Sequence, residues 1–259
     1  MILVIDIGNT NTKFGVFDGK MSIDSWRVSS DRTRTADEYG VTLCTLLANS
    51  GIDKEKIEGV IISSVIPSLN YTVEHMCKYY LHRTPIMVGP GTKTGLNIKV
   101  DNPREVGADR IVNCVAAYKK YGGCIVIDFG TATTFNILTR KGEFVGGVIS
   151  PGIKSSMESL VSSTAQLPRI ELERPSSVLA KNTTTNMQAG IVFGFAGLVD
   201  YLVKKIRAEM NDPDLPVIAT GGLGELIAKE LDGIKVDRTL TLDGLRMLYE
   251  MNTEKKDLK

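Results

Sequence analysis

The chain has 259 residues, of which 42% are hydrophobic and 24% are charged, with a formal net charge of +1. These values are ordinary for a globular protein of one or two domains, and the charge gives no reason to expect a nucleic acid or an anionic membrane as a partner. No apolar run is long enough to cross a bilayer and the N-terminus lacks a signal-peptide pattern, so we expect a cytoplasmic protein without a membrane partner.

Cysteine and histidine offer little chemistry. The chain has four cysteines without C-x-x-C spacing, namely Cys44, Cys77, Cys114 and Cys124. Three fall in segments predicted as helix and one opens a strand, so we expect small apolar side chains rather than disulfides. The two histidines, His75 and His82, flank a polar helix. The sequence therefore gives very little support to a histidine-based metal site or a Ser-His-Asp triad.

The first half of the chain alternates predicted strands and helices. Strands are expected over residues 2–5, 13–17, 21–28, 60–65 and 85–88. The run from Thr35 to Glu38 has the form of a helix capping box, and apolar residues follow at helical spacing until Gly51. Further helices are expected from Pro67 and over residues 106–121.

The second half restarts with the same alternation. Strands are expected over residues 125–127, 134–138, 144–149 and 217–219, and helices over residues 154–166, 187–210, 225–231 and 240–249. Residues 168–185 are expected to form a surface loop, and residues 252–259 a frayed, charged end. The order of elements favours an α/β fold with a mixed sheet covered by helices on both faces in each half. We place the boundary near residue 115, which gives an N-terminal lobe of residues 1–115 and a C-terminal lobe of residues 116–259.

The start of the chain is repeated, in altered form, at its middle. Residues 3–10 read LVIDIGNT and residues 125–132 read IVIDFGTA. In each copy an apolar strand ends on an aspartate, Asp6 or Asp128, and a glycine follows within two residues. Backbone N–H groups at such a turn suit phosphate oxygens, and the aspartate suits a cation or a water molecule beside them. We therefore expect two related lobes with a nucleotide cleft between them.

The first copy carries the best candidate for a phosphate loop. A carboxylate at the end of a buried strand is costly unless it is paired or coordinated. An aspartate that caps its own turn would explain one copy alone, but two equivalent copies favour a functional carboxylate. Small donors and one cation follow Asp6, the set that surrounds a polyphosphate: Gly8, Asn9, Thr10, Asn11, Thr12 and Lys13. The Walker and G-x-G-x-x-G spacings are absent, which counts against a nicotinamide enzyme.

Three further candidates are weaker on spacing alone. Asp109 and Arg110 begin a predicted helix, where they could hold a substrate's hydroxyl and carboxylate, although ordinary helix-end chemistry explains Asp109 equally well. Asp128 could coordinate a cation while Thr131 donates to a phosphate, or Asp128 could be a hydrogen-bonded hairpin residue. The polar run at residues 181–185 precedes a long helix, where capping is the simpler role and substrate contact the alternative.

Together these runs resemble those of type III pantothenate kinases, in the family's order and over nearly the whole chain. The resemblance rests on residues 6–13 (DIGNTNTK), 102–110 (NPREVGADR), 128–131 (DFGT), 147–152 (GVISPG), 182–183 and 220–222 (TGG). The run at residues 102–110 is the most specific. The family belongs to the superfamily of acetate and sugar kinases, heat-shock chaperones and actin. The resemblance therefore implies two related actin-like, ribonuclease H-like lobes, with mixed sheets and helices on both faces.

The resemblance also implies an activity: transfer of the ATP γ-phosphoryl group to the primary hydroxyl of pantothenate, which gives 4′-phosphopantothenate in the first step of coenzyme A biosynthesis. ATP would act with Mg²⁺. The implied ATP-binding residues are Asp6, Ile7, Gly8, Asn9, Thr10, Asn11, Thr12, Lys13 and Thr131.

The remaining implied roles concern pantothenate and a monovalent cation. Asp109 would be the general base, and Gly107, Ala108, Asp109 and Arg110 would hold pantothenate. Asp128 would bind K⁺ or NH₄⁺. Thr183 would reach pantothenate from the neighbouring subunit of a homodimer, with the active site near the interface. Many members carry Tyr before the Asp-Asn-Pro run, and Val100 stands here, which removes one side-chain hydrogen bond to pantothenate.

Other functions share this scaffold. An actin-like or chaperone-like nucleotide switch would need large additional subdomains, for which 259 residues leave little room. An exopolyphosphatase-like hydrolase would use water in place of the alcohol. A non-catalytic regulatory member could dispense with Asp109 or Arg110, and both are present. Supplying ATP and K⁺ with either water or pantothenate separates these functions.

Overall fold

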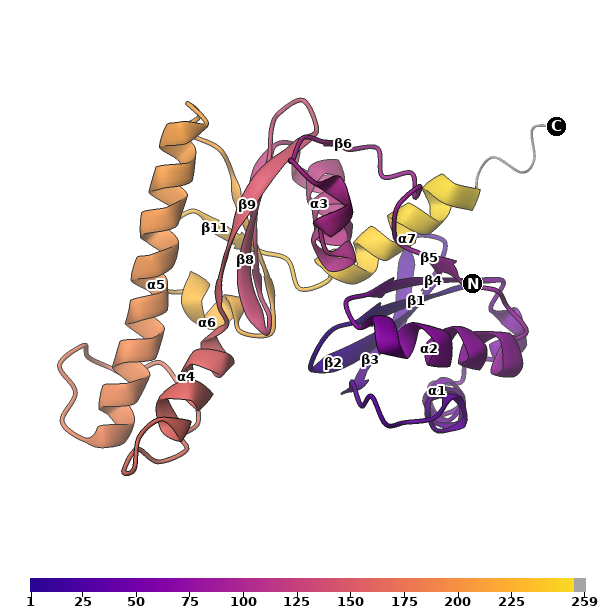
Figure 1. Cartoon of the computed structure of the whole chain (residues 1–259), viewed down its shortest axis with the longest axis horizontal. Coiled ribbons are helices and arrows are strands. Elements are labelled where there is room, and N and C mark those ends of the chain that lie inside the picture. The colour runs from indigo at the N-terminus through magenta and orange to yellow at the C-terminus, as the bar shows by residue number, and fades with distance from the viewer. Residues whose placement is uncertain (254–259) are drawn as a thin grey trace. The chain divides into compact units, whose positions relative to one another are not determined.

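The computed structural model describes residues 1–253 and divides into two compact units, each built around its own sheet (Figure 1). Unit 1 comprises Met1–Leu96, Asp101–Ala116 and the described residues from Leu240 onward. Unit 2 comprises Asn97–Val100 and Ala117–Thr239. The α/β class expected from the sequence is confirmed in both units.

The sheet of unit 1 has the strand order β3-β2-β1-β4-β5. Its strands are β1 (Ile2–Ile7), β2 (Asn11–Asp18), β3 (Met21–Ser29), β4 (Gly59–Ser64) and β5 (Ile86–Met87). β2 runs antiparallel to both β1 and β3, whereas β4 runs parallel to β1 and β5 parallel to β4. The sheet is therefore mixed, with the Asp6 strand at its centre.

Successive residues of β1 point to opposite faces of this sheet. Leu3, Ile5 and Ile7 join a core with residues of α1 (Ala36–Asn49) and α2 (Pro67–Tyr80). The predicted capping box of α1 is confirmed: the Thr35 hydroxyl accepts from the Glu38 N–H at 3.3 Å, and the Glu38 carboxylate accepts from the Thr35 N–H at 2.7 Å.

The other face of the sheet packs against α7 (Leu240–Thr253), which contacts β1 and β4. Close approach is possible because glycines stand on this face: a Cβ at Gly15 would lie 3.2 Å from Leu242, and one at Gly59 would overlap Tyr249. Val4 and Asp6 share this face, because they alternate with the residues of the α1/α2 core. The α7 face is therefore the one on which Asp6 lies.

The sheet of unit 2 has the strand order β11-β10-β7-β8-β9-β6. Its strands are β6 (Asn97–Ile98), β7 (Cys124–Phe129), β8 (Ala132–Leu138), β9 (Glu143–Pro151), β10 (Val217–Gly221) and β11 (Ile234–Val236). The helices α4 (Ile153–Ser162), α5 (Thr183–Glu209) and α6 (Gly224–Ala228) belong to this unit. Residues Ile125, Ile127 and Phe129 form a core with the buried face of α5.

The two sheets repeat one strand order. β3-β2-β1-β4-β5 corresponds to β9-β8-β7-β10-β11, and β6 is added beyond β9. The directions also correspond: β7 is antiparallel to β8 and parallel to β10, as β1 is to β2 and β4. The short sequence repeat around Asp6 and Asp128 therefore marks a duplication of a whole sheet.

The compact units differ from the lobes expected at residues 1–115 and 116–259 in two segments. Residues 97–100 group with unit 2, because β6 pairs in parallel with β9. The described residues from Leu240 group with unit 1, where the Thr241 hydroxyl bonds Asn113 Oδ1 at 2.8 Å. The helix α3 (Ala108–Tyr121) contributes to both units, since the division falls after Ala116.

Several local expectations need correction. The strands β6 and β11 and the 3-10 helices at Lys54–Lys56 and Pro103–Glu105 were not expected. α5 begins at Thr183 rather than residue 187, because the Asn182 side chain caps it by accepting from the Thr185 N–H at 2.9 Å. The end expected to fray at 252–259 is helical at residues 252 and 253, where Asn252 bonds Lys93; residues 254–259 lie outside the described part.

None of the four cysteines takes part in a disulfide among the described residues: Cys77, Cys114 and Cys124 are buried and Cys44 is half-buried. None of the helices in residues 1–253 combines the length and apolar character that a membrane span requires.

Candidate active site

The side chain of Asp6 sits at the end of β1 with a basic and a hydroxyl residue on the neighbouring strands. Lys13 of β2 and Ser63 of β4 are its partners in register. The Lys13 ammonium lies 3.5 Å from Asp6 Oδ2, and the two side chains are 29% and 9% exposed. A buried carboxylate is thus paired with a lysine that still reaches solvent.

The second oxygen of Asp6 has no such partner. Asp6 Oδ1 and Ser63 Oγ are both buried, and neither has a hydrogen-bond partner of normal geometry among the described residues. The Ser63 hydroxyl nevertheless opposes the burial-raised pKa of Asp6 as a weak hydrogen-bond donor does, although the geometry between the two side chains falls short of a normal hydrogen bond. Buried polar atoms are rarely left unpaired, so this pair marks a place where an external polar group fits.

Asp109, in the first turn of α3, lies beside this pair. Its Oδ1 accepts the Arg110 backbone N–H at 2.8 Å. A Cβ at Gly107 would lie 2.6 Å from the same oxygen, so the carboxylate turns back against the residue that precedes the helix. The spacing Gly-Ala-Asp-Arg therefore has a local steric reason, because only glycine leaves room for this rotamer.

Burial and charge set the acidity of the two carboxylates. Burial raises the pKa of Asp6; the Lys13 ammonium opposes this, and the nearby Asp109 carboxylate raises that pKa further. Burial also raises the pKa of Asp109, while the Arg110 N–H, the Arg110 guanidinium and the Lys13 ammonium lower it. Lys13 therefore stabilises the ionised form of both acids. We call these four residues, Asp6, Lys13, Ser63 and Asp109, the Asp6 cluster.

The loop after β1 presents only part of the predicted phosphate-binding set. The Gly8 N–H donates to the Asn11 carbonyl at 3.0 Å, while Asn9 and Thr10 are exposed at the tip. Ile7 and Thr12 point away from solvent: Ile7 belongs to the core and the buried Thr12 hydroxyl bonds Ser30 at 2.9 Å.

Asp128 occupies the equivalent place in unit 2 but has a different setting. Its partners in register are Thr134 of β8 and Thr220 of β10. A Cβ at Gly221 would lie 2.7 Å from Asp128 Oδ1 and 2.6 Å from the Phe129 carbonyl oxygen, and Gly221 has a φ of +93°. The glycine lets a carboxylate and a carbonyl oxygen gather at one turn, and oxygen donors of this kind suit hard cations such as K⁺.

Thr131 and Thr183 are both exposed residues of unit 2. The Thr131 carbonyl accepts from the Ser155 hydroxyl at 2.9 Å, which fixes the backbone of the turn after β7. Thr183 is the first residue of α5, and the capping role belongs to its neighbour Asn182. Both threonine side chains therefore stand on the surface of unit 2.

Among the described residues, no group of three or more His, Cys, Asp or Glu side chains is placed to hold a metal ion by itself. Mg²⁺ in kinases is usually held by one or two carboxylates together with the substrate phosphates. The unpaired Asp6 Oδ1 fits that mode of binding, because the nucleotide would supply the other ligands.

Ser63 was missed in the sequence as part of these sites, and Gly221 stood only within the TGG run of the family resemblance, without a role of its own. Ser63 looks like an ordinary polar end of an apolar strand, and only the parallel register of β1 and β4 brings it to Asp6. Gly221 stands in a Gly-Gly pair, which by itself signals a turn. The duplication of the sheet connects Ser63 with Thr220, the residue before Gly221, since Ser63 and Thr220 hold equivalent positions in register beside the two aspartates.

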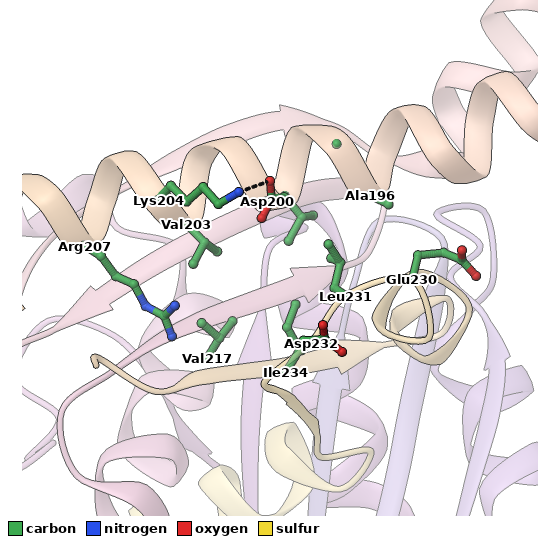
Figure 2. Close-up of a pocket in the computed structure, with 12 residues that line it drawn as sticks. Ala196, Asp200, Val203, Lys204, Arg207, Val217, Glu230, Leu231, Asp232 and Ile234 are labelled. Carbon is green, nitrogen blue, oxygen red and sulfur yellow. Dashed lines mark hydrogen bonds and ion pairs between the residues drawn. The ribbon is translucent and has the colours of Figure 1, made fainter. Parts of the chain in front are cut away.

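A cavity of about 410 Å³ lies elsewhere in unit 2, under α5 and beside β10 and β11 (Figure 2). Most of its charged side chains already have partners: Lys204 bonds Asp200 at 2.7 Å, and Arg207 donates twice to the Leu215 carbonyl. Glu230 pairs with Arg174. None of the described residues that line it is a predicted site residue, so we do not assign the active site there.

Comparison with known proteins identifies the family. The family model described as type III pantothenate kinase matches residues 2–205. Solved structures with a similar fold include a candidate transcriptional activator of the Baf family from Campylobacter jejuni, with 19% identity, a TM-score of 0.57 and coverage of 98% of this chain and 100% of that one.

Two others are similar over nearly the full length. The activator of 2-hydroxyisocaproyl-CoA dehydratase from Clostridium difficile, solved with bound ADPNP, is 16% identical with a TM-score of 0.55 and covers 100% of this chain and 99% of its own. A candidate 2-dehydro-3-deoxygalactonokinase from Sinorhizobium meliloti is 13% identical with a TM-score of 0.63, and the match covers 97% of this chain and 96% of that one. At these identities the structures establish a shared fold, that of actin-like ATPases and sugar kinases. Because the family model spans most of the sequence, the chain belongs to the type III pantothenate kinase family.

Proposed function

We propose that this protein transfers the γ-phosphoryl group of ATP to the primary hydroxyl of pantothenate, giving 4′-phosphopantothenate and ADP. Family membership supports the kinase reaction and its acceptor. The observation that carries the residue assignment is the Asp6 cluster, in which Lys13 stands close enough to two buried carboxylates to lower the pKa of each. A regulatory protein of the same fold would not need this arrangement.

Asp109 is the general base in this proposal. It accepts the proton of the pantothenate hydroxyl as that oxygen bonds to the γ-phosphorus, and the bond to the bridging oxygen of ADP breaks. Phosphoryl transfer passes through a loose transition state, so placement and charge neutralisation contribute more than covalent chemistry. Burial, which raises the pKa of Asp109, makes this carboxylate a stronger base than an exposed aspartate.

The loop of residues 6–13 and Thr131 bind the ATP phosphates. The Lys13 ammonium offsets phosphate charge, and the exposed Asn9 and Thr10 supply donors at the tip of the loop. Asp6 would hold Mg²⁺ together with ATP, and Asp128 with the Phe129 carbonyl would hold K⁺ or NH₄⁺. Bound cations supply charge neutralisation for the phosphates.

In this proposal, pantothenate is bound by residues around the start of α3 and by a threonine of the neighbouring subunit. Gly107, Ala108, Asp109 and Arg110 hold the substrate, and the Arg110 guanidinium suits its carboxylate. Thr183 contacts pantothenate from the neighbouring subunit of a homodimer.

The exposed face of α5 supports the dimer. Gly190, Gly194 and Gly197 lie on it, and a Cβ at any of them would meet nothing within 4 Å. At 3.6 residues per turn, Thr183 lies on the same face as Gly190 and Gly194. A helix of a second copy could approach this face closely, beside Thr183.

A product assay tests the function. Purified protein receives ATP, Mg²⁺ and K⁺ with either pantothenate or water alone, and 4′-phosphopantothenate and inorganic phosphate are measured by mass spectrometry and a colorimetric assay. We expect phosphopantothenate only with the alcohol and little free phosphate. Free phosphate in equal amounts in both reactions would indicate a hydrolase, and no ATP consumption in either would indicate a regulatory member.

A further inference from the structure

The unpaired atoms Asp6 Oδ1 and Ser63 Oγ are the starting point. Of the described residues, only a few have a buried side-chain oxygen or nitrogen without a hydrogen-bond partner, and two of these stand side by side in the Asp6 cluster. The side chain of Ser63 is fully buried at 0% exposure, and Asp6 is 6% exposed. A hydroxyl and a carboxylate oxygen that are both left unpaired at the same place could bind one polar group from outside the chain, such as a water molecule.

The duplicated sheet gives an independent reason to connect Ser63 with function. Ser63 lies opposite Asp6 in the parallel pair of β1 and β4, and Thr220 lies opposite Asp128 in the parallel pair of β7 and β10. Both are buried, at 0% and 2% exposure. Each sheet thus places one buried hydroxyl residue beside its aspartate, although most of the surrounding strand residues are apolar.

We propose that Ser63 is a positioning residue, whose hydroxyl and Asp6 Oδ1 together bind one water molecule of the hydrated divalent cation that accompanies ATP. The inference rests on the proposed function in one respect only, namely that Mg²⁺ and ATP bind at Asp6. Mg²⁺ dehydrates reluctantly and usually keeps several waters, so a protein recognises it largely through groups that bind those waters. A hydroxyl can donate to the carboxylate and accept from the water at once.

Thermal stability distinguishes a positioning role of Ser63 from a purely structural one. Ser63→Ala leaves a methyl group and removes a buried hydroxyl that has no hydrogen-bond partner of normal geometry, so the free protein should be as stable as before, or slightly more stable. A hydroxyl that supports the fold would instead lower the melting temperature when it is removed. The variant Ser63→Ala therefore separates the two roles by thermal unfolding without ligand.

The decisive measurement is the factor by which Mg²⁺ tightens binding of a non-hydrolysable ATP analogue, obtained by titration calorimetry with and without Mg²⁺. For Ser63→Ala we expect this factor to fall about tenfold, the usual cost of losing an outer-shell partner of a metal, while binding without Mg²⁺ is unchanged. Ser63→Thr, which installs the residue found at the equivalent place in unit 2, should restore most of the factor.

Ser64→Ala is the matched control. Ser64 is the next residue, points to the opposite sheet face and bonds the Ile66 N–H at 3.1 Å, so its loss should leave the Mg²⁺ factor unchanged. The proposal is overturned if Ser63→Ala keeps the wild-type factor, if wild type shows no Mg²⁺ factor, or if Ser63→Ala melts well below wild type. No acceptor is present in this assay, so a failure to phosphorylate pantothenate would remove the proposed function without deciding the role of Ser63.

Discussion

Asp6 and Asp128 hold the same place in two sheets of the same strand order, and their surroundings differ. In unit 1, Asp6 is buried, faces Lys13 at 3.5 Å and has Asp109 close by. In unit 2, Asp128 is half-buried, faces Thr134 and packs against Gly221. The duplicated fold supplies an aspartate at a turn, and the neighbours decide its chemistry.

The difference indicates that the two aspartates have different roles, one beside a lysine and a second acid and the other beside a turn of oxygen donors. A lysine beside two acids can neutralise phosphate charge and tune a base, whereas a turn of oxygen donors suits a cation. The variants below test these roles, and they are ordered by the size of the expected effect.

Asp109→Asn should have the largest effect. Loss of a general base typically lowers turnover by 10²- to 10⁴-fold, so we expect kcat to fall about a thousandfold while ATP affinity changes little. Steady-state kinetics and analogue binding measure the two quantities. The exposed Asp18→Asn serves as a control, and an Asp109→Asn enzyme with near-normal turnover would exclude this residue as the base.

Lys13→Met should come next, with kcat/KM for ATP reduced about 100-fold through loss of phosphate stabilisation. Lys13 lowers the pKa of Asp109, so its removal raises that pKa further and the acidic limb of the rate profile should move to higher pH. Exposed Lys20→Met should show neither change. A profile that stays in place would mean that Lys13 does not act on the base.

Asp128→Asn tests the unit 2 side of the comparison. The K⁺ concentration for half-maximal activity should rise at least about tenfold, since even an outer partner of a metal contributes that much. Titration of K⁺ at fixed Na⁺ measures it, with exposed Asp232→Asn as the control. An unchanged K⁺ dependence would remove Asp128 from this role.

Gly221→Ala should destabilise the turn beside Asp128. Its positive φ and a Cβ only 2.6 Å from the Phe129 carbonyl oxygen predict a cost of about 1–3 kcal/mol in unfolding free energy. Gly89→Ala is the control, because a Cβ there meets nothing within 4 Å. Equal denaturant midpoints for the two variants would contradict the proposed crowding.

Asp6→Asn should give the smallest change in stability, and it should stabilise the protein whereas Gly221→Ala destabilises it. Burial raises the pKa of Asp6 in the folded protein above its usual 3.8. At pH 7 the ionised carboxylate therefore lowers the free energy of unfolding, and this loss is recovered as the pH falls through the folded pKa and the group is protonated. The amide removes this cost, and we expect Tm at pH 7 to rise by a few degrees, with the gain fading toward pH 4. A lower Tm at pH 7 would show that the ionised pair with Lys13 stabilises the fold.

Much of the fold could be predicted because its signals are local. The capping box at Thr35 and the apolar strand before each aspartate depend on neighbouring residues, and both are found in the structure. The strand β6 is only two residues long and pairs with the distant β9, so no local pattern indicates it. Placing α7 in unit 1 depends on close packing such as Gly244 against Val112, which has no signal within either segment.

The candidate site shows the same limit. Asp6 and Asp128 were predicted from the repeat and Lys13 from its residue type and position, whereas the role of Asp109 came from the family resemblance, because its spacing fits ordinary helix-end chemistry equally well. Ser63 became visible only through the register of two parallel strands that lie more than fifty residues apart in sequence.

A crystal structure with an ATP analogue and pantothenate tests the central claim most directly. The account predicts the primary hydroxyl of pantothenate within about 3 Å of an Asp109 carboxylate oxygen, the reach that proton transfer requires. Pantothenate bound with that hydroxyl turned away from Asp109, or seated in another part of the chain, would contradict it.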